Sequence, residues 1–126
     1  MKRWRTVSLV FIIDRFKSVG YALKGIVEVV RTEANFQVQI IVSTIVIAAG
    51  FYFDLTKIEW ILQLFCIGLV LGVESLNTAI ERLSDKVSPD FDPQIGKVKD
   101  LSAGAVLLVS ITAIIVGLLI YLPKIF

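Results

Sequence analysis

A strip of acidic and amide side chains at the polar end of a long apolar run is the strongest candidate for chemistry in this sequence. This acidic strip consists of Glu74, Asn77, Glu81 and Asp85. On a helix, their spacing places all four side chains on one face less than about 90° wide. An ionisable side chain inside an apolar span costs at least about 2.5 kcal/mol on insertion scales, so Glu74 indicates a functional site with a partner.

Carboxylates and lysines together are suited to bind a magnesium phosphate. Mg²⁺ takes oxygen ligands, usually one or two carboxylates plus phosphates and water, and lysines neutralise the remaining phosphate charge. Further candidates for such a site are Glu33, Lys17, Lys24, Lys97 and Lys99. The sequence contains no glycine-rich GxxxxGK[ST] loop, so we expect a nucleotide site unlike that of a P-loop enzyme or a protein kinase.

Glu74 lies about six residues, or roughly 9 Å, inside the end of its apolar run. A substrate hydroxyl that reaches this depth would belong to a lipid. A carboxylate in a low dielectric holds a proton more tightly than in water, which suits Glu74 to act as a general base on an alcohol. The alternative is an interhelical hydrogen bond or ion pair between subunits, and Glu81 and Asp85 could be solvated charges at a helix end.

The composition is that of an integral membrane protein. Hydrophobic residues make up 56% of the 126 residues, compared with about 45–50% in soluble globular chains. The mean hydropathy is +0.83. Three apolar segments approach the roughly 20 residues that cross a bilayer. We therefore predict an all-α fold that forms a single membrane domain over residues 1–126.

Several classes of chemistry are excluded by residue type. The sequence has no histidine, so acid and base roles fall to Glu, Asp or Lys. The single cysteine, Cys66, has no intrachain partner and is expected to act as a small buried hydrophobe. A net charge of +2 gives no support for nucleic-acid binding.

Five segments position the acidic strip. Apolar residues at three- and four-residue steps between Ile12 and Val30 predict an amphipathic surface helix, and the apolar run before it is too short for a signal peptide. The predicted segments are a surface helix over about 6–32, spans over about 36–53 and 58–80, with the second helix continuing to about 87, a loop over 88–98, and a third span over about 101–122.

The boundaries follow from helix-breaking and capping residues. A very short linker after Asp54 requires the first two spans to be antiparallel. Pro89, Pro93 and Gly96 predict the loop. Asp100 is the expected N-cap of the third span, and Pro123 is expected to end it.

The distribution of Lys and Arg predicts the orientation. Seven of these residues lie in residues 1–35 and four in residues 81–100, whereas only Lys57 and Lys124 lie on the opposite side. The positive-inside rule then places the N-terminus, the acidic strip and the loop on the cytoplasmic face, where nucleotide is available. Three spans give each helix only two neighbours, so we also expect a homo-oligomer.

The motif Glu74-x-x-Asn77-Thr78-Ala79-Ile80-Glu81-x3-Asp85, followed by Lys99-Asp100-x3-Gly104-Ala105-Val106-Leu107, closely resembles the signature of the prokaryotic diacylglycerol kinase family. Tyr21-x-x-Lys24-Gly25 and Glu33-x-x-Phe36 match as well. The resemblance covers most of the chain. It implies a small homotrimeric enzyme of the bacterial cytoplasmic (inner) membrane that uses ATP and Mg²⁺ to phosphorylate a lipid alcohol, with sites shared between protomers.

The resemblance also implies roles for individual residues. Glu74 would be the catalytic base, and Glu33 and Glu81 would bind the magnesium carried by ATP. The implied ATP-binding set is Lys17, Tyr21, Glu33, Asn77, Glu81, Asp85, Asp90, Asp92, Lys99 and Asp100.

Some residues depart from the family pattern, and others indicate which lipid is the substrate. The family commonly has Tyr-His where Phe91-Asp92 stand, and many members have a basic residue at Gln37. Pro89, Pro93 and the segment 102–107 are more similar to the undecaprenol branch than to the diacylglycerol branch. We therefore favour undecaprenol over diacylglycerol. A non-enzymatic channel or transporter subunit with inward carboxylates is the alternative from another class.

Overall fold

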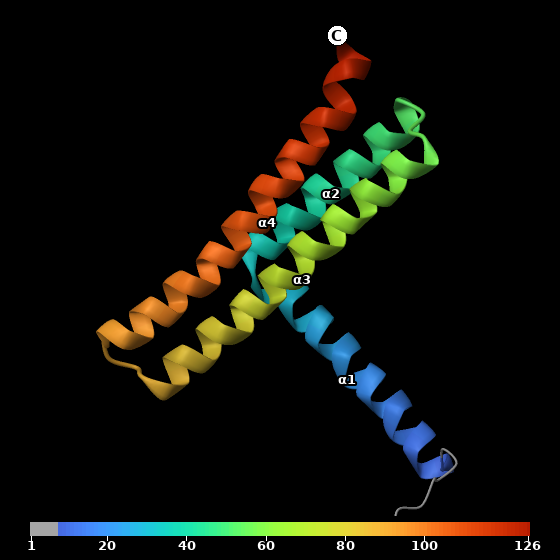
Figure 1. Cartoon of the computed structure of the whole chain (residues 1–126). Coiled ribbons are helices and arrows are strands. Elements are labelled where there is room, and N and C mark those ends of the chain that lie inside the picture. The colour runs from blue at the N-terminus through green and yellow to red at the C-terminus, as the bar shows by residue number, and fades with distance from the viewer. Residues whose placement is uncertain (1–7) are drawn as a thin grey trace, which may run out of the picture. The chain divides into compact units, whose positions relative to one another are not determined.

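The computed structural model describes residues 8–126, which form α1 (Leu9–Thr32), α2 (Ala34–Tyr52), α3 (Lys57–Val87) and α4 (Pro93–Ile125) (Figure 1). The helix α1 and residues 33–126 form separate compact units. The predicted start of the first helix near residue 6, together with Lys2, Arg3 and Arg5, lies outside the described residues. The described part of the chain contains no strand, which confirms the all-α prediction.

The helix α1 carries charged and aromatic side chains side by side. The Arg15 guanidinium lies 5.0 Å from the centroid of the Phe11 ring, and the Lys24 ammonium lies 5.7 Å from that of Tyr21. Apolar residues such as Phe16 and Leu23 are exposed. This mixture is typical of an amphipathic helix, as the sequence predicted.

The turn between α2 and α3 is built by two capping motifs. Asp54 adopts a left-handed backbone (φ 55°), and the Leu55 amide donates to the Gly50 carbonyl oxygen at 3.1 Å. This pattern is a Schellman motif. At the start of α3, the Thr56 hydroxyl accepts from the Glu59 amide at 3.2 Å, and the Glu59 carboxylate accepts from the Thr56 amide at 3.0 Å. The tight turn makes α2 and α3 antiparallel, as predicted (Figure 1).

The predictions for the start and end of α4 were wrong. The helix begins at Pro93, so the connection from α3 is residues 88–92 rather than 88–98. Asp92, not Asp100, is the N-cap: its carboxylate accepts from the amides of Gln94 at 2.8 Å and Ile95 at 3.5 Å. Pro93 starts the helix because the first helical position needs no backbone donor. At the other end, α4 continues through Pro123 to Ile125.

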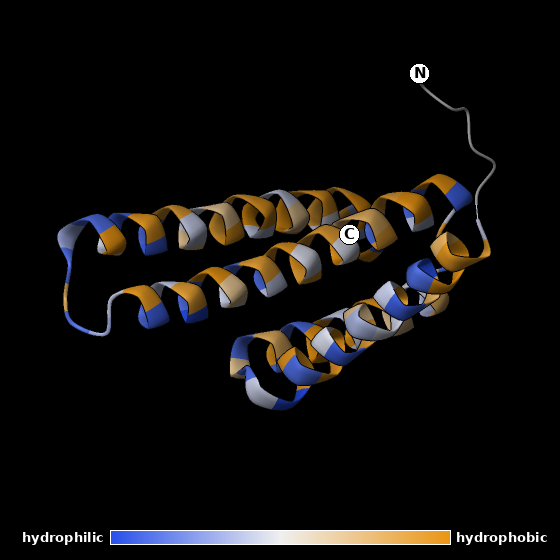
Figure 2. Ribbon diagram, turned by 90° about the horizontal axis from the view of Figure 1, so that it is seen from below, coloured by the Kyte–Doolittle hydropathy of each residue, from blue (hydrophilic) through white to orange (hydrophobic). Residues whose placement is uncertain are grey.

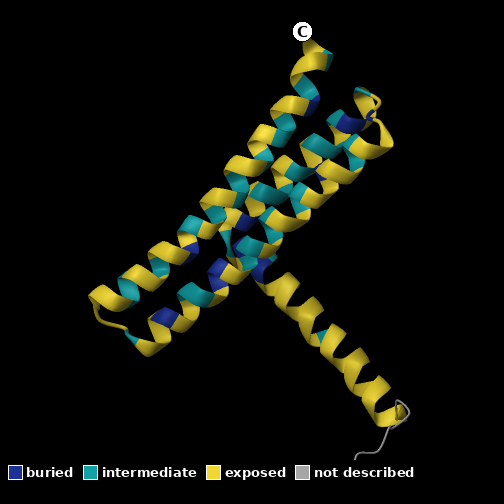
Figure 3. Cartoon of the chain, in the orientation of Figure 1, coloured by how far each residue is buried: buried dark blue, intermediate teal, exposed yellow. Residues whose placement is uncertain are grey.

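Helices α2, α3 and α4 form a three-helix unit in which α3 packs against both neighbours. Hydrophobic residues cover most of the helix lengths (Figure 2), and these three helices are long and apolar enough to cross a membrane. Buried residues are sparse (Figure 3), and no described side chain is less than 2% exposed. The chain is therefore a membrane protein with extensive apolar surface for lipid or for further copies.

The end of the unit that contains the α2–α3 turn is fixed by contacts between all three helices. The Tyr121 hydroxyl lies 3.0 Å from the Val46 carbonyl oxygen and also pairs with the Gln63 amide oxygen. The Lys124 ammonium lies 3.1 Å from a Glu59 carboxylate oxygen. These contacts connect α4 to α2 and to the start of α3.

Gly50→Ala should destabilise this end of the unit. An added Cβ would lie 2.7 and 2.9 Å from two ring carbons of Trp60, which is closer than packed atoms come. We expect a loss of about 1–3 kcal/mol in the free energy of unfolding. Gly117→Ala is the matched control, because its Cβ would meet no atom within 4 Å. Thermal unfolding in detergent checks the pair, and equal melting temperatures for the two variants would contradict the predicted clash.

Candidate active site

The acidic strip lies along α3 with burial that falls toward the end of the helix. Glu74 is 3% exposed and Asn77 is 7% exposed, Glu81 is half-buried, and Asp85 is exposed. The helix remains unbroken through Val87, as predicted, so one continuous element carries all four side chains. The strip therefore leads from a buried carboxylate to an exposed one.

Glu74 is held from α2. The Gln39 amide nitrogen donates to Glu74 Oε2 at 3.5 Å, a long hydrogen bond between residues 35 positions apart. The charges of Glu81 and Glu33 act on the same carboxylate. The second amide atom, Gln39 Oε1, is buried and has no hydrogen-bond partner among the described residues. Glu74 is thus a buried carboxylate near two other carboxylates, with the amides of Gln39 and Asn77 as neutral partners.

The carboxylates of Glu33 and Glu81 interact electrostatically with that of Glu74. Glu33 pairs with Arg82, and Glu81 accepts a hydrogen bond from Asn77. Glu33 immediately precedes α2, and its Oε1 lies 2.9 Å from Nη2 of Arg82 on α3. The Asn77 amide nitrogen donates to Glu81 Oε1 at 3.3 Å, while Asn77 Oδ1 is buried without a partner in the described part of the chain. Both carboxylates thus interact electrostatically with Glu74, and their role as metal ligands stays a prediction.

Lys99 and Asp85 form an ion pair between α4 and α3, across the short connection between these helices. Asp100, the next residue on α4, is exposed. The two helices therefore place a cation and two carboxylates of the predicted nucleotide-binding set near the end of the acidic strip.

Asp90 and Asp92 lie in the connection between α3 and α4 and have local contacts. The Asp90 carbonyl oxygen accepts from the Ser88 hydroxyl at 2.8 Å. The Asp92 carboxylate caps α4, as described above. Capping explains Asp92 by itself, so a role in nucleotide binding stays a prediction for both residues.

Lys17 and Tyr21 lie on α1 and are exposed. They belong to the other compact unit, so their predicted contribution to the site stays a prediction.

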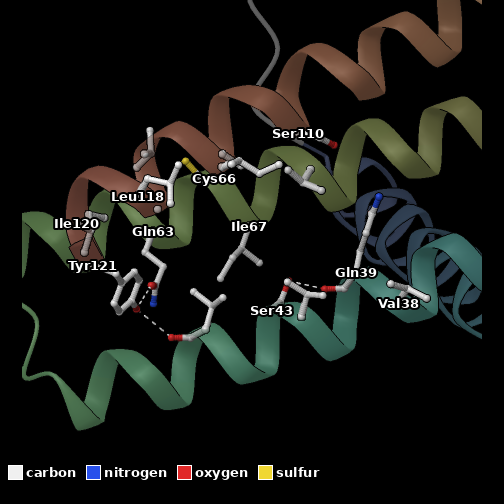
Figure 4. A pocket seen from close by; sticks show the side chains of 17 residues that line it. Val38, Gln39, Ser43, Gln63, Cys66, Ile67, Ser110, Leu118, Ile120 and Tyr121 are labelled. Carbon is white, nitrogen blue, oxygen red and sulfur yellow. Dashed lines mark hydrogen bonds between the residues drawn. The ribbon is translucent and has the colours of Figure 1, made fainter. Parts of the chain in front are cut away.

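A cavity of about 470 Å³ lies between α2, α3 and α4. Its wall is mostly aliphatic, with Gln39 toward one end and Gln63 and Tyr121 toward the other (Figure 4). Gln39 both lines this cavity and hydrogen-bonds to Glu74. The cavity is therefore adjacent to the buried carboxylate.

The donors near Glu74 fit a magnesium ion that arrives with a nucleotide. Within residues 8–126 no group of three or more His, Cys, Asp or Glu side chains could hold a metal by itself. Mg²⁺ bound to phosphates needs only one or two protein carboxylates, and Glu33 and Glu81 could supply two. Asn77, whose Oδ1 has no partner among residues 8–126, donates its amide to Glu81. The residues therefore fit a cation shared with substrate better than a resident metal centre.

Two residues of the site were missed by the sequence analysis. Gln39 is a polar side chain within an apolar span, and Arg82 follows Glu81 directly. The polar side chain of Gln39 inside an apolar span could have indicated a role in the site. The positive charge of Arg82 beside the acidic strip could have indicated the same.

Comparison with known proteins shows the family of this chain. The family of prokaryotic diacylglycerol kinases matches residues 20–121. Undecaprenol kinase of Bacillus subtilis (strain 168) is 41% identical over 109 residues, which cover 86% of this chain and 89% of the relative. Diacylglycerol kinase of Escherichia coli (strain K12) is 30% identical over 99 residues, covering 79% of this chain and 81% of the relative. The chain belongs to the prokaryotic diacylglycerol kinase family, whose members are membrane lipid kinases.

Proposed function

We propose that this chain is an ATP- and magnesium-dependent kinase that phosphorylates undecaprenol to undecaprenyl phosphate. The observation that carries the proposal is the carboxylate of Glu74, which is 3% exposed within a helix apolar enough to cross a membrane. Such a carboxylate can meet a hydroxyl only if the hydroxyl belongs to a lipid. The undecaprenol kinase of Bacillus subtilis, with 41% identity, favours this lipid.

Glu74 is the general base in this proposal. Its carboxylate takes the proton of the lipid hydroxyl while the hydroxyl oxygen attacks the γ-phosphorus of ATP. The bond from that phosphorus to the β,γ-bridging oxygen breaks, ADP leaves, and no phosphoenzyme forms. The Gln39 amide donates to Glu74 Oε2 at 3.5 Å and positions the carboxylate for the hydroxyl.

The nucleotide is held at the exposed end of the acidic strip. Lys99 neutralises phosphate charge, and Asp85 and Asp100 orient the lysine and the nucleotide. Lys17 and Tyr21 from α1, and Asp90 and Asp92 from the connection, frame the same nucleotide. Glu33 and Glu81, supported by Asn77, would hold Mg²⁺, which neutralises charge on the transferred phosphoryl group.

The lipid chain enters through the aliphatic cavity between α2, α3 and α4. Gln39 lines it next to Glu74, so a chain in the cavity can carry its hydroxyl to the base. An aliphatic wall gives little selection by polarity, and this supports a hydrocarbon substrate rather than a soluble alcohol.

The working enzyme is a homotrimer in the bacterial cytoplasmic membrane, with the N-terminus and the site on the cytoplasmic side. The excess of Lys and Arg on that side supports the orientation. The sparse burial within one chain supports the oligomer, because the exposed apolar faces need partners or lipid. Parts of neighbouring protomers then complete each site.

Transfer of labelled phosphate from ATP to undecaprenol and to diacylglycerol, offered in parallel micelles, tests the proposal. We expect faster transfer to undecaprenol, dependent on Mg²⁺. Faster transfer to diacylglycerol would favour the second candidate, a kinase making phosphatidic acid, which is supported by the relative in Escherichia coli. Ion flux in proteoliposomes without phosphate transfer to either lipid would overturn the kinase in favour of a channel.

A further inference from the structure

Arg82 is a cation within the candidate active site that the family signature does not include. It follows Glu81 on α3, and its Nη2 lies 2.9 Å from Oε1 of Glu33, 49 positions earlier in the chain. The two side chains are 48% and 31% exposed. An ion pair this exposed contributes little to folding, so stability alone is a weak reason for its position.

The pair occupies an atom that the proposed reaction needs. Glu33 Oε1 is a proposed ligand of the divalent cation, and in this structure it holds a guanidinium. Asp85 is paired in the same way with Lys99. Two carboxylates of the site are thus each paired with a cation of the same chain.

We propose that Arg82 exchanges partners: it holds Glu33 when the site is empty, and it binds a phosphate oxygen of the nucleotide when ATP and a divalent cation bind. This inference rests on the proposed function. A guanidinium matches phosphate geometry with two parallel hydrogen bonds. Because the Arg82 side chain is 48% exposed, a ligand in solution can reach its guanidinium.

The exchange couples the two ligands. A divalent cation that binds alone must compete with Arg82 for Glu33 and is repelled by the guanidinium. A nucleotide that binds alone must take Arg82 away from Glu33. When both bind, the carboxylate and the guanidinium each gain an opposite charge, so each ligand raises the affinity for the other.

Arg82→Gln separates these effects because it removes the charge and keeps a polar side chain. In the full chain in detergent, Mn²⁺ binding without nucleotide, followed by electron paramagnetic resonance, should tighten by at least about fivefold. ATP binding measured in EDTA should weaken by a similar factor. Opposite signs are expected because Arg82 competes with the cation but binds the nucleotide.

Lys86→Gln is the matched control, since it removes the same charge from the next turn of α3. Its effect on Mn²⁺ affinity should be smaller than about twofold. In a Glu33→Gln background, Arg82→Gln should raise Mn²⁺ affinity by less than about twofold, because only the repulsion by the guanidinium remains. Equal effects of Arg82→Gln and Lys86→Gln, or the same gain without Glu33, would overturn the inference.

Arg82→Lys provides a second variant if Arg82→Gln does not fold. Lysine keeps the charge but cannot form the two-bond contact with phosphate, so ATP binding in EDTA should weaken while Mn²⁺ affinity stays near that of the wild type. Unchanged ATP binding in this variant would contradict the exchange. The Mn²⁺ measurements need no turnover. If Arg82→Gln tightens Mn²⁺ binding but the wild-type protein transfers no phosphate, the kinase is rejected and the competition between Arg82 and the cation for Glu33 is kept. If the wild-type protein transfers phosphate but Arg82→Gln does not tighten Mn²⁺ binding, only the exchange of partners by Arg82 is rejected.

Discussion

Glu74→Gln should lower the rate of phosphate transfer by about 100- to 10,000-fold, the range that a general base contributes. The amide fills the same space and can still accept from Gln39, which donates to Oε2 in this structure. It cannot take a proton from the lipid hydroxyl. The chemical step is therefore lost while the shape of the site is kept.

The measurement is transfer of labelled phosphate in mixed micelles, together with MgATP affinity. Affinity for MgATP should stay within about twofold of the wild type, because Glu74 belongs to the lipid side of the site and removing one negative charge has only a modest effect on the nucleotide. A variant that binds MgATP and does not turn over would localise the defect to proton removal. Retained turnover would reject Glu74 as the base.

Glu59→Gln is the matched control for this change. It is the same substitution in the same helix, in the first turn of α3, which follows the turn from α2. The variant loses the ion pair with Lys124, and ion pairs at exposed positions contribute little to stability. Transfer should remain near the wild-type rate, so a similar loss in both variants would indicate a general effect of the substitution.

The acidic strip and its helix were predictable from the sequence because they depend on local periodicity. Residues three and four positions apart share a helix face in any fold, and an apolar run of this length has few alternatives to a helix in a membrane. The structure confirms one unbroken helix from Lys57 to Val87. It adds the gradient of burial from Glu74 to Asp85, which depends on how α2 and α4 cover α3.

The start of α4 was mispredicted because proline has two opposite meanings. Pro93 was interpreted as a helix breaker, but at the first helical position its missing donor costs nothing and its fixed φ favours the helix. Asp92 directly before it supplies the cap. The pattern Asp-Pro was visible in the sequence and indicates a helix start, whereas the prediction used Pro93 together with Pro89 and Gly96 as loop residues.

The contacts of Gln39 and Arg82 could not be read from local pattern. Gln39 reaches Glu74 across 35 positions and Arg82 reaches Glu33 across 49. Such pairs depend on the packing of α2 on α3, and helical periodicity gives no register between two helices. Sequence alone therefore identified the carboxylates but not the side chains that hold them.

Glu81→Ala should weaken ATP binding in the presence of Mg²⁺ by at least about 10-fold, since even the loss of an outer-shell partner of a metal costs 10- to 100-fold. Glu81 is half-buried and accepts from the Asn77 amide, so its carboxylate is fixed near Glu74. Without it, only Glu33 remains of the two proposed cation ligands. ATP binding in EDTA should be nearly unchanged.

Asp85→Ala separates a metal role from a nucleotide role. Asp85 lies one turn further along the same strip and pairs with Lys99, so its loss should change ATP binding with and without Mg²⁺ by the same factor. The deciding quantity is the ratio of the two affinities in each variant, measured by equilibrium dialysis with radiolabelled ATP. A ratio that falls in Glu81→Ala but not in Asp85→Ala assigns the cation to Glu81. If both variants keep the wild-type ratio, the cation is held elsewhere and Glu81 only supports Asn77.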